Sequence, residues 1–154
     1  MFKTMKRTLL SIVMIGIAST AVAQSALELW EDDRTQIFDA ADLTPEDFIW
    51  RARPIVVFAQ SPLDPLFVQQ MELLSERKDE LAERDVIVIS DTTPEPPSQL
   101  RTNLRPRGFM LAIIDKDGKT AIRKPAPWDV REISRTIDKT ALRQQEVRDR
   151  RVSE

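Results

Sequence analysis

Three short apolar runs most strongly constrain the fold of this chain. They lie at residues 55–59 (IVVFA), 86–89 (VIVI) and 109–114 (FMLAII), and each is rich in β-branched or aromatic residues. Because the runs are continuously apolar rather than alternating, they are typical of central strands that are covered on both faces. Residues 66–83, between the first two runs, carry apolar side chains at helical spacing. A strand, a helix and a strand in this order predict a βαβ unit with a right-handed crossover.

The second half of the chain predicts a hairpin between two helices. Asp117-Gly118, after the third run, is a tight-turn dipeptide, and residues 120–123 are the expected return strand, whose charges suit a sheet edge. A short helix is expected at 98–104, and a closing helix at 128–139 has its apolar residues on one face. The order of βαβ unit, ββ hairpin and closing helix predicts a thioredoxin-like α/β fold with a mixed four-stranded sheet.

The first 23 residues have the features of a secretory signal peptide. Three cations precede an apolar stretch at residues 8–20, and Ala21-Val22-Ala23 then gives small residues at the positions that a signal peptidase reads. We expect cleavage between Ala23 and Gln24. The apolar stretch is shorter than the ~20 residues that span a bilayer, so no membrane span is expected after cleavage. The sequence therefore predicts a protein that is exported to the periplasm or the medium.

The rest of the chain divides into three predicted parts. Residues 24–37 show little pattern and are predicted to be irregular, residues 38–148 form the thioredoxin-like domain, and residues 149–154 are predicted to be a disordered tail. Inside the domain, the stretch TPED at 44–47 predicts a helix start, with a threonine cap and a proline in the first turn. The arginine-rich segment from Arg143 is either a frayed helix extension or disordered.

Composition excludes several classes of chemistry. Without the signal peptide, 20 basic residues would face 25 acidic ones, and a mildly acidic protein lacks the cationic field that nucleic-acid binding needs. The chain has no cysteine and no histidine, which excludes thiol–disulfide oxidoreductase and thiol peroxidase activities and disfavours a zinc site. A calcium loop at 115–118 would need a glutamate where Lys124 stands, so this segment is predicted to be a hairpin turn. We therefore expect no metal and no cofactor.

A set of ordered stretches gives the chain a family resemblance. These are Phe48-Ile-Trp50 with Arg53, then Gln69-Gln70, LAERDVIV at 81–88, Arg107-Gly-Phe109, Ile114-Asp-Lys-Asp-Gly118, Ile137-Asp138 and LRQQE at 142–146. Together they resemble the bacterial family of domain of unknown function 4174, which is related to a module of vertebrate extracellular-matrix and sushi-repeat proteins. The resemblance covers about residues 38–148. It implies a thioredoxin-like fold similar to that of peroxiredoxins and leaves the biochemical activity open.

The loop after the first strand is where a thioredoxin-like domain would act. A redox member would carry cysteine at Ser61 or Asp64, and neither residue can supply a thiolate. Ser61 also lacks a nearby histidine or lysine that could activate it as a nucleophile. Both side chains are therefore predicted to cap the helix that begins near Leu66.

Polar residues next to the strand ends form the candidate binding rim. Because ligands of open α/β sheets bind where strands end, these residues are expected to lie close together. If Arg107 faces Asp64 there, the two would form a structural ion pair or, alternatively, a carboxylate clamp. The predicted rim comprises Gln60, Ser61, Asp64, Asp91, Thr92 and Arg107.

Three possible functions fit this sequence. The first is a non-catalytic binding or interaction module in the cell envelope, whose partner is an unknown protein or a small ligand. The alternative is a hydrolase-like acid–base enzyme that uses Asp64 or Asp91, whose pKa would then have to be strongly perturbed. Association through the arginine-rich tail is a third possibility. Trp50 and Trp128 flank the predicted sheet and are expected to be core or edge-covering aromatics, with ligand platforms as the alternative.

Overall fold

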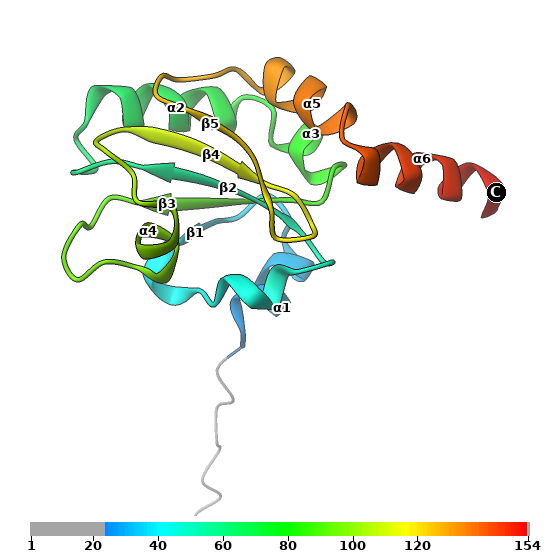
Figure 1. The fold of residues 1–154 in the computed structure, drawn as a ribbon, viewed down its shortest axis with the longest axis horizontal. Helices are drawn as coiled ribbons and strands as arrows, with labels where there is room; N and C mark the ends of the chain where they lie inside the picture. The colour runs from blue at the N-terminus through cyan, green and yellow to red at the C-terminus, as the bar shows by residue number, and fades with distance from the viewer. Residues whose placement is uncertain (1–23, 154) are drawn as a thin grey trace, which may run out of the picture.

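The three apolar runs lie side by side in the middle of one sheet (Figure 1). In this computed structural model, which describes residues 24–153, they form β2 (Arg53–Phe58), β3 (Val86–Asp91) and β4 (Met110–Ile114). β2 and β3 are parallel, with Phe58 opposite Asp91, and β4 runs antiparallel to β2. The predicted βαβ unit is confirmed, and so is the thioredoxin-like order of elements.

The sheet has five strands rather than the predicted four. Their order is β1-β3-β2-β4-β5, with β1 (Ile37–Asp39) parallel to β3 and β5 (Thr120–Lys124) antiparallel to β4 at the opposite edge. β1 adds the fifth strand. It has only three residues, of which Phe38 alone is buried, so its sequence carries too few positions to show a pattern.

Three helices cover one face of the sheet (Figure 1). The crossover from β2 to β3 holds α2 (Pro65–Ser75) and α3 (Lys78–Ala82), where one helix was expected. The chain breaks between them at Arg77, whose φ of −140° is not helical. α5 (Val130–Asp138) is the closing helix and packs against them. These helices bury a cluster with the strands that includes Leu74, Leu81, Ile133 and Ile137.

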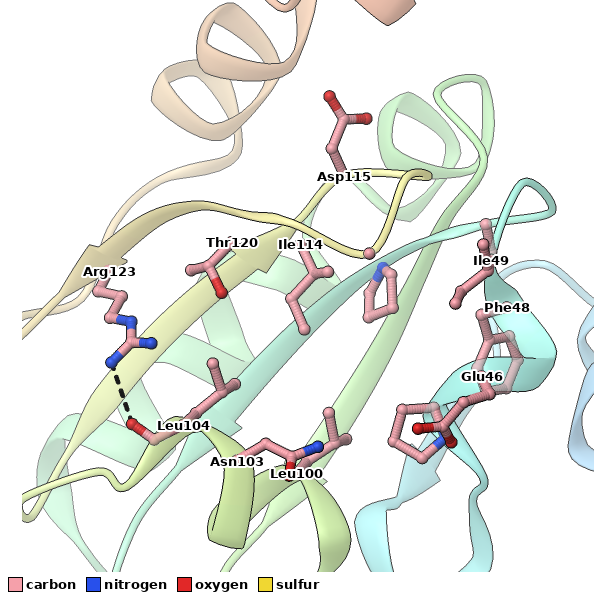
Figure 2. A pocket seen from close by; sticks show the side chains of 14 residues that line it. Glu46, Phe48, Ile49, Leu100, Asn103, Leu104, Ile114, Asp115, Thr120 and Arg123 are labelled. Atoms are coloured by element: carbon pink, nitrogen blue, oxygen red, sulfur yellow. Dashed lines mark hydrogen bonds between the residues drawn. The ribbon is translucent and has the colours of Figure 1, made fainter.

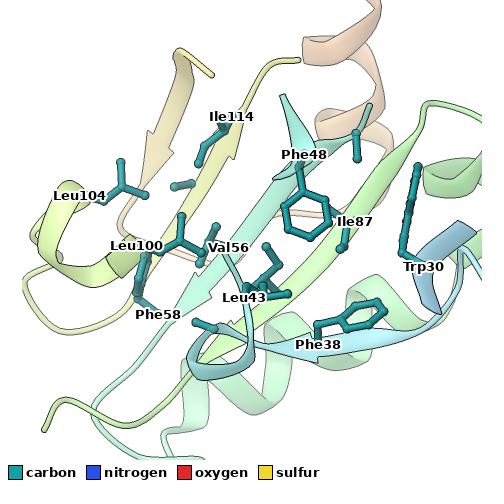
Figure 3. Close-up of a cluster of buried hydrophobic side chains, with 14 residues drawn as sticks. Trp30, Phe38, Leu43, Phe48, Val56, Phe58, Ile87, Leu100, Leu104 and Ile114 are labelled. Carbon is teal, nitrogen blue, oxygen red and sulfur yellow. The ribbon is translucent and has the colours of Figure 1, made fainter. Parts of the chain in front are cut away.

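Shorter elements cover the other face of the sheet. They are α1 (Ala26–Asp32), the 3₁₀ turns η1 (Ala40–Asp42) and η2 (Pro45–Phe48), and α4 (Gln99–Leu104). Thr44 precedes η2 but makes no side-chain cap, so the predicted helix there is a single 3₁₀ turn. Figure 3 shows the cluster that these elements bury against β2 and β3. It includes Trp30, Phe38, Phe48, Val56, Phe58, Ile87 and Leu100.

The segment at 24–37 is structured rather than irregular. Ser25 and Glu28 form a capping box at the start of α1, in which each side chain accepts a hydrogen bond from the other residue's backbone. Trp30 is buried, and its indole Nε1 donates to the carbonyl of Val86 at 3.1 Å. The prediction failed because α1 is only seven residues long and buries a single side chain.

The end of the chain is also more ordered than predicted. α6 (Ala141–Ser153) is helical through most of the segment that was expected to be disordered, and it runs outward from the body (Figure 1). Alanine, leucine, arginine, glutamine and glutamate favour helix, which explains this continuation. The predicted signal peptide at residues 1–23, with its cleavage after Ala23, lies outside the described residues. Within residues 24–153, no helix combines the length and the apolar character needed to cross a membrane.

Candidate functional site

The fold brings the segments of the predicted rim to one end of the sheet. β2 and β3 are parallel, so the loops that follow Phe58 and Asp91 leave the same edge, and β4 begins opposite Phe58. The backbone N–H of Ala59 donates to the carbonyl of Asp91 at 2.9 Å, which fixes the two loops together. This juxtaposition follows from strand direction alone.

The loop after β2 uses its polar side chains to shape the backbone. Asp64 caps α2 as predicted: its Oδ1 accepts from the N–H of Leu66 at 2.8 Å and of Phe67 at 3.4 Å. Ser61 does not cap the helix. Its Oγ accepts from the N–H of Leu63 at 3.2 Å and closes the turn before Asp64. Both side chains therefore stabilise the local backbone by accepting its hydrogen bonds. Among residues 24–153, no lysine hydrogen-bonds to Ser61.

Asp91 is buried in an ion pair rather than exposed on a rim. Arg101 donates from Nε and Nη2 to its Oδ1, at 2.9 and 2.7 Å, and the hydroxyl of Ser98 donates to Oδ2 at 2.5 Å. The same Nη2 also donates to the carbonyls of Ala59 and Asp91. Only 2% of Asp91 and 8% of Arg101 are exposed, so this pair ties α4 to the ends of β2 and β3.

The side chains of the remaining rim residues, Gln60, Thr92 and Arg107, form no hydrogen bond or ion pair with one another. Gln60 and Arg107 are exposed and Thr92 is half-buried. Arg107 does not face Asp64 in an ion pair within residues 24–153. An apolar side chain is also exposed at this end: Leu63 exposes 84% of its surface. Sequence reasoning missed this leucine because a single apolar residue between prolines has no periodic pattern.

A cleft of about 280 Å³ lies elsewhere, beside the beginning of β2 and the end of β4 (Figure 2). Figure 2 shows its walls coming from η2, from α4 and from β5, with Ile114 between them. Most of the lining is apolar. The apolar residues are Pro45, Phe48, Ile49, Ala52, Pro54, Leu100, Leu104 and Ile114.

The polar groups of the cleft stand around its apolar centre. Glu46 accepts from the side-chain amide of Gln99 at 2.8 Å, and Arg123 donates to the carbonyl of Leu104 at 3.0 Å. Thr120 supplies a hydroxyl to the lining. Among residues 24–153, no carboxylate or lysine hydrogen-bonds to this hydroxyl. Such a lining suits the binding of an apolar group and offers no nucleophile with a base.

A buried arginine network adjoins the cleft through Asp115, which is one of its lining residues. Arg53, 1% exposed, donates at 2.9 Å to each of the Asp115 carboxylate, the Arg84 carbonyl and the Glu146 carboxylate. Burial raises the pKa of Glu146, but hydrogen bonds from Arg53 and Lys116 outweigh it and hold that pKa below its ordinary value. The network joins β2, the β4–β5 turn and α6.

Trp50 is exposed beside the cleft, contrary to its prediction as a core or edge-covering aromatic. It exposes 63% of its surface, and its neighbour Ile49, which lines the cleft, exposes 41%. Trp50 has a φ of 63°, and its N–H donates to the carbonyl of Lys116 at 2.7 Å. This backbone turn directs the side chain outward. Trp128 is half-buried against the face that α2, α3 and α5 cover, as an edge-covering aromatic would be.

Comparison with protein families now identifies the chain. The family model of the domain of unknown function DUF4174 matches residues 44–146. The chain belongs to the DUF4174 family. No curated protein matches it.

Solved structures place this DUF4174 protein among thioredoxin-like folds. Chloroplastic thioredoxin z matches with a TM-score of 0.53 and 18% identity, over 66% of this chain and 91% of the thioredoxin. Prx1a of Plasmodium yoelii matches with a TM-score of 0.52 and 17% identity, over 68% and 80%. The 2-Cys peroxiredoxin of Plasmodium vivax gives 0.50 and 14%, over 66% and 83%. At these identities the likeness shows the fold alone.

Two stretches of the DUF4174 resemblance meet at the cleft. Phe48 and Ile49 come from the first stretch, whereas Ile114, Asp115 and Gly118 come from another that lies more than sixty residues later. Sequence reasoning singled out both stretches but read them as fold-shaping residues. The two stretches converge because β2 pairs with β4 in antiparallel orientation, which brings the beginning of β2 next to the end of β4. Among residues 24–153, no three histidine, cysteine, aspartate or glutamate side chains gather to hold a metal ion.

Proposed function

We propose that this DUF4174 protein is an exported, non-catalytic binding module whose cleft receives an apolar side chain of a protein partner in the cell envelope. One observation carries the proposal. The two separate DUF4174 stretches line a single apolar cleft, and Ile49 and Trp50 are exposed beside it. Exposed apolar surface next to a hollow is typical of interaction sites.

The size of the cleft favours a side chain over a large ligand. Its volume of about 280 Å³ lies at the lower end of the range for small-molecule pockets. A tryptophan that is 63% exposed beside the hollow adds contact area outside it. Tryptophan is enriched among the residues that dominate the energy of protein–protein binding. We therefore assign the contact to Trp50 and the cleft together.

The polar geometry supports binding rather than catalysis. The chain has no cysteine, so it cannot perform the thiol chemistry of thioredoxins or peroxiredoxins. The acid–base alternative needs a carboxylate that is free to exchange a proton with a substrate. Asp64 is engaged as a helix cap, and Asp91 is engaged by Arg101 and Ser98. Neither carboxylate is therefore free to exchange a proton with a substrate, as the acid–base alternative requires.

Export is part of the same proposal. Its support is the order of cations, apolar stretch and small residues at the start of the sequence, with cleavage between Ala23 and Gln24. The rim at the other end of the sheet stays a prediction of a second contact surface. Gln60, Thr92 and Arg107 are its accessible polar members, and Leu63 would be its apolar contact.

A cleft-filling substitution tests the proposal. Asn103 is exposed on α4 and lines the cleft, whereas its neighbour Thr102 is exposed but does not line it. We expect Asn103→Phe to abolish the capture of a specific partner by in-cell crosslinking, because the added ring occupies the hollow. Thr102→Phe on the same helix should leave capture unchanged.

Other outcomes of this comparison are equally informative. Equal capture by both folded variants would contradict binding in the cleft. A small molecule that copurifies with wild type in native mass spectrometry, and is lost from Asn103→Phe, would replace the protein partner by a small ligand. Thermal unfolding of both variants confirms that any loss is not a loss of fold.

A further inference from the structure

Four cations line a second hollow at the outer edge of the sheet. Arg105 and Arg107 lie in the loop before β4, and Arg123 and Lys124 are the last two residues of β5. The hollow has a volume of about 270 Å³, and no acidic residue contributes to its lining within the described part of the chain. Its other lining residues are Phe109, Met110 and Pro125.

None of these four charges has a carboxylate partner among the residues that the structure describes. Cations elsewhere, such as Arg53, Arg101 and Lys116, have carboxylate partners at 2.7–3.0 Å. In residues 24–153, no carboxylate oxygen lies within 4.0 Å of the side-chain nitrogen atoms of these four residues. We call the hollow that they line the groove. A protein with more acidic than basic residues has thus gathered unpaired positive charge in one groove.

Two of the cations are positioned by neutral partners. Arg123 Nη1 donates to the carbonyl of Leu104 at 3.0 Å, and the Lys124 ammonium lies 4.2 Å from the centre of the Trp128 ring. These contacts restrict both side chains and leave their charges uncompensated, since neither partner is an anion. The groove therefore presents a partly preorganised set of donors.

We infer that this groove binds a phosphate group. One carboxylate has two oxygens, and the fork of a single arginine already satisfies both. A phosphate monoester carries a charge near −2 and three strong acceptor oxygens, so it can accept from several of the three arginines and the lysine at once. The groove is larger than a phosphate group, so the organic part of the phosphate ester would lie over Phe109 and Met110.

This site is separate from the proposed partner cleft, although Arg123 lines both. The phosphate can belong to a soluble phosphate ester or to a lipid headgroup, and both offer the same oxygens to the groove. Arg105 and Lys124 line the groove but not the cleft, so substitutions of these two residues test the inference without changing the cleft. Trp50→Ala should in turn leave phosphate binding intact.

The test compares two pairs of charge-removing substitutions. Wild type, Arg105→Gln/Lys124→Gln and Arg131→Gln/Lys139→Gln are titrated with inorganic phosphate and followed by amide NMR shifts. Arg131 and Lys139 are exposed and make no ion pair in the described part of the chain, so they match the net-charge change. We expect saturable binding to weaken about tenfold or more in the groove variant, because two charge-assisted hydrogen bonds are lost. The control pair should bind like wild type.

A second arm identifies the source of the phosphate. Vesicles containing phosphatidic acid or phosphatidylglycerol are compared with phosphatidylcholine vesicles in cosedimentation. Groove-dependent binding to anionic vesicles without binding of inorganic phosphate supports a lipid headgroup. Binding of inorganic phosphate in a groove-dependent manner supports a soluble ester. If neither probe binds, or if the control pair weakens binding as much as the groove pair, the inference is wrong.

Discussion

Two buried arginines organise the opposite ends of the sheet. Arg101 joins Asp91, at the end of β3, to the carbonyl of Ala59 just after β2. Arg53 starts β2 and joins Asp115 to Glu146. A buried charge is tolerated only when carboxylates and carbonyls satisfy its donors, and both guanidinium groups meet that condition. These polar clusters are therefore supports for the fold rather than reactive sites.

Removal of one member of the Asp91 pair tests this assignment. We expect Arg101→Met to lower the free energy of unfolding by about 3–5 kcal/mol, because the Asp91 carboxylate then stays buried without its charge partner. Urea unfolding followed by circular dichroism measures the loss. Arg131→Met, on the surface of α5, is the control and should unfold like wild type.

The double variant Asp91→Leu/Arg101→Met separates charge from packing. It should recover part of the lost stability, since it removes both buried charges together. A single Arg101→Met variant as stable as wild type would show that Asp91 is not held by this pair.

At the residue scale, local chemistry was predictable and tertiary pairing was not. The Asp64 cap could be predicted because its hydrogen-bond partners lie two and three residues away. The Asp91–Arg101 pair could not, since an arginine on a short helix reads as a surface residue. Trp50 was misjudged because a tryptophan next to apolar residues reads as core, whereas its positive φ, which no sequence pattern shows, turns it outward.

At the scale of elements, predictability follows how local the signal is in the sequence. The β4–β5 hairpin was predicted from Asp117-Gly118, and α4 from its start near Ser98, whose Oγ indeed accepts from the N–H of Arg101 at 3.0 Å. α1 and β1 escaped prediction because each depends on distant partners. Trp30 of α1, for instance, donates to the carbonyl of Val86, 56 residues away.

The attachment of α6 gives a pH-dependent prediction. Glu146 on α6 has a pKa below its ordinary value of 4.5, because hydrogen bonds from Arg53 and Lys116 outweigh the opposing effect of burial. A lowered folded-state pKa adds stability above the unfolded-state pKa, and that stability disappears as the pH falls through the folded value. Wild type should therefore melt higher than Glu146→Gln at pH 7, and the difference should shrink by pH 3.

Differential scanning calorimetry at the two pH values measures this difference. Glu132→Gln, which removes an exposed ion pair on α5, is the matched control and should show little difference at either pH. A Glu146→Gln variant that melts like wild type at pH 7 would contradict the role of Glu146 in holding α6.

At the scale of the whole molecule, the two ends of the sheet differ in character. The end that corresponds to the predicted rim has its carboxylates engaged and an exposed Leu63. The other end has the cleft and Trp50, beside the Arg53 network. Sequence alone predicted the layers and the thioredoxin-like topology, because apolar runs report burial. It could not place the cleft, since a hollow depends on how η2, α4 and β5 stand around the sheet.

Photo-crosslinking in cells can show directly whether a partner binds at the cleft end of the molecule. A photo-crosslinking amino acid is placed in turn at Trp50, at Leu63 and, as background, at exposed Lys139, and the protein is irradiated in cells. We predict one specific crosslinked partner from position 50, competed away by purified wild type and absent at position 139. The same partner captured from position 63 and not from position 50 would contradict binding at the cleft and assign it to the rim.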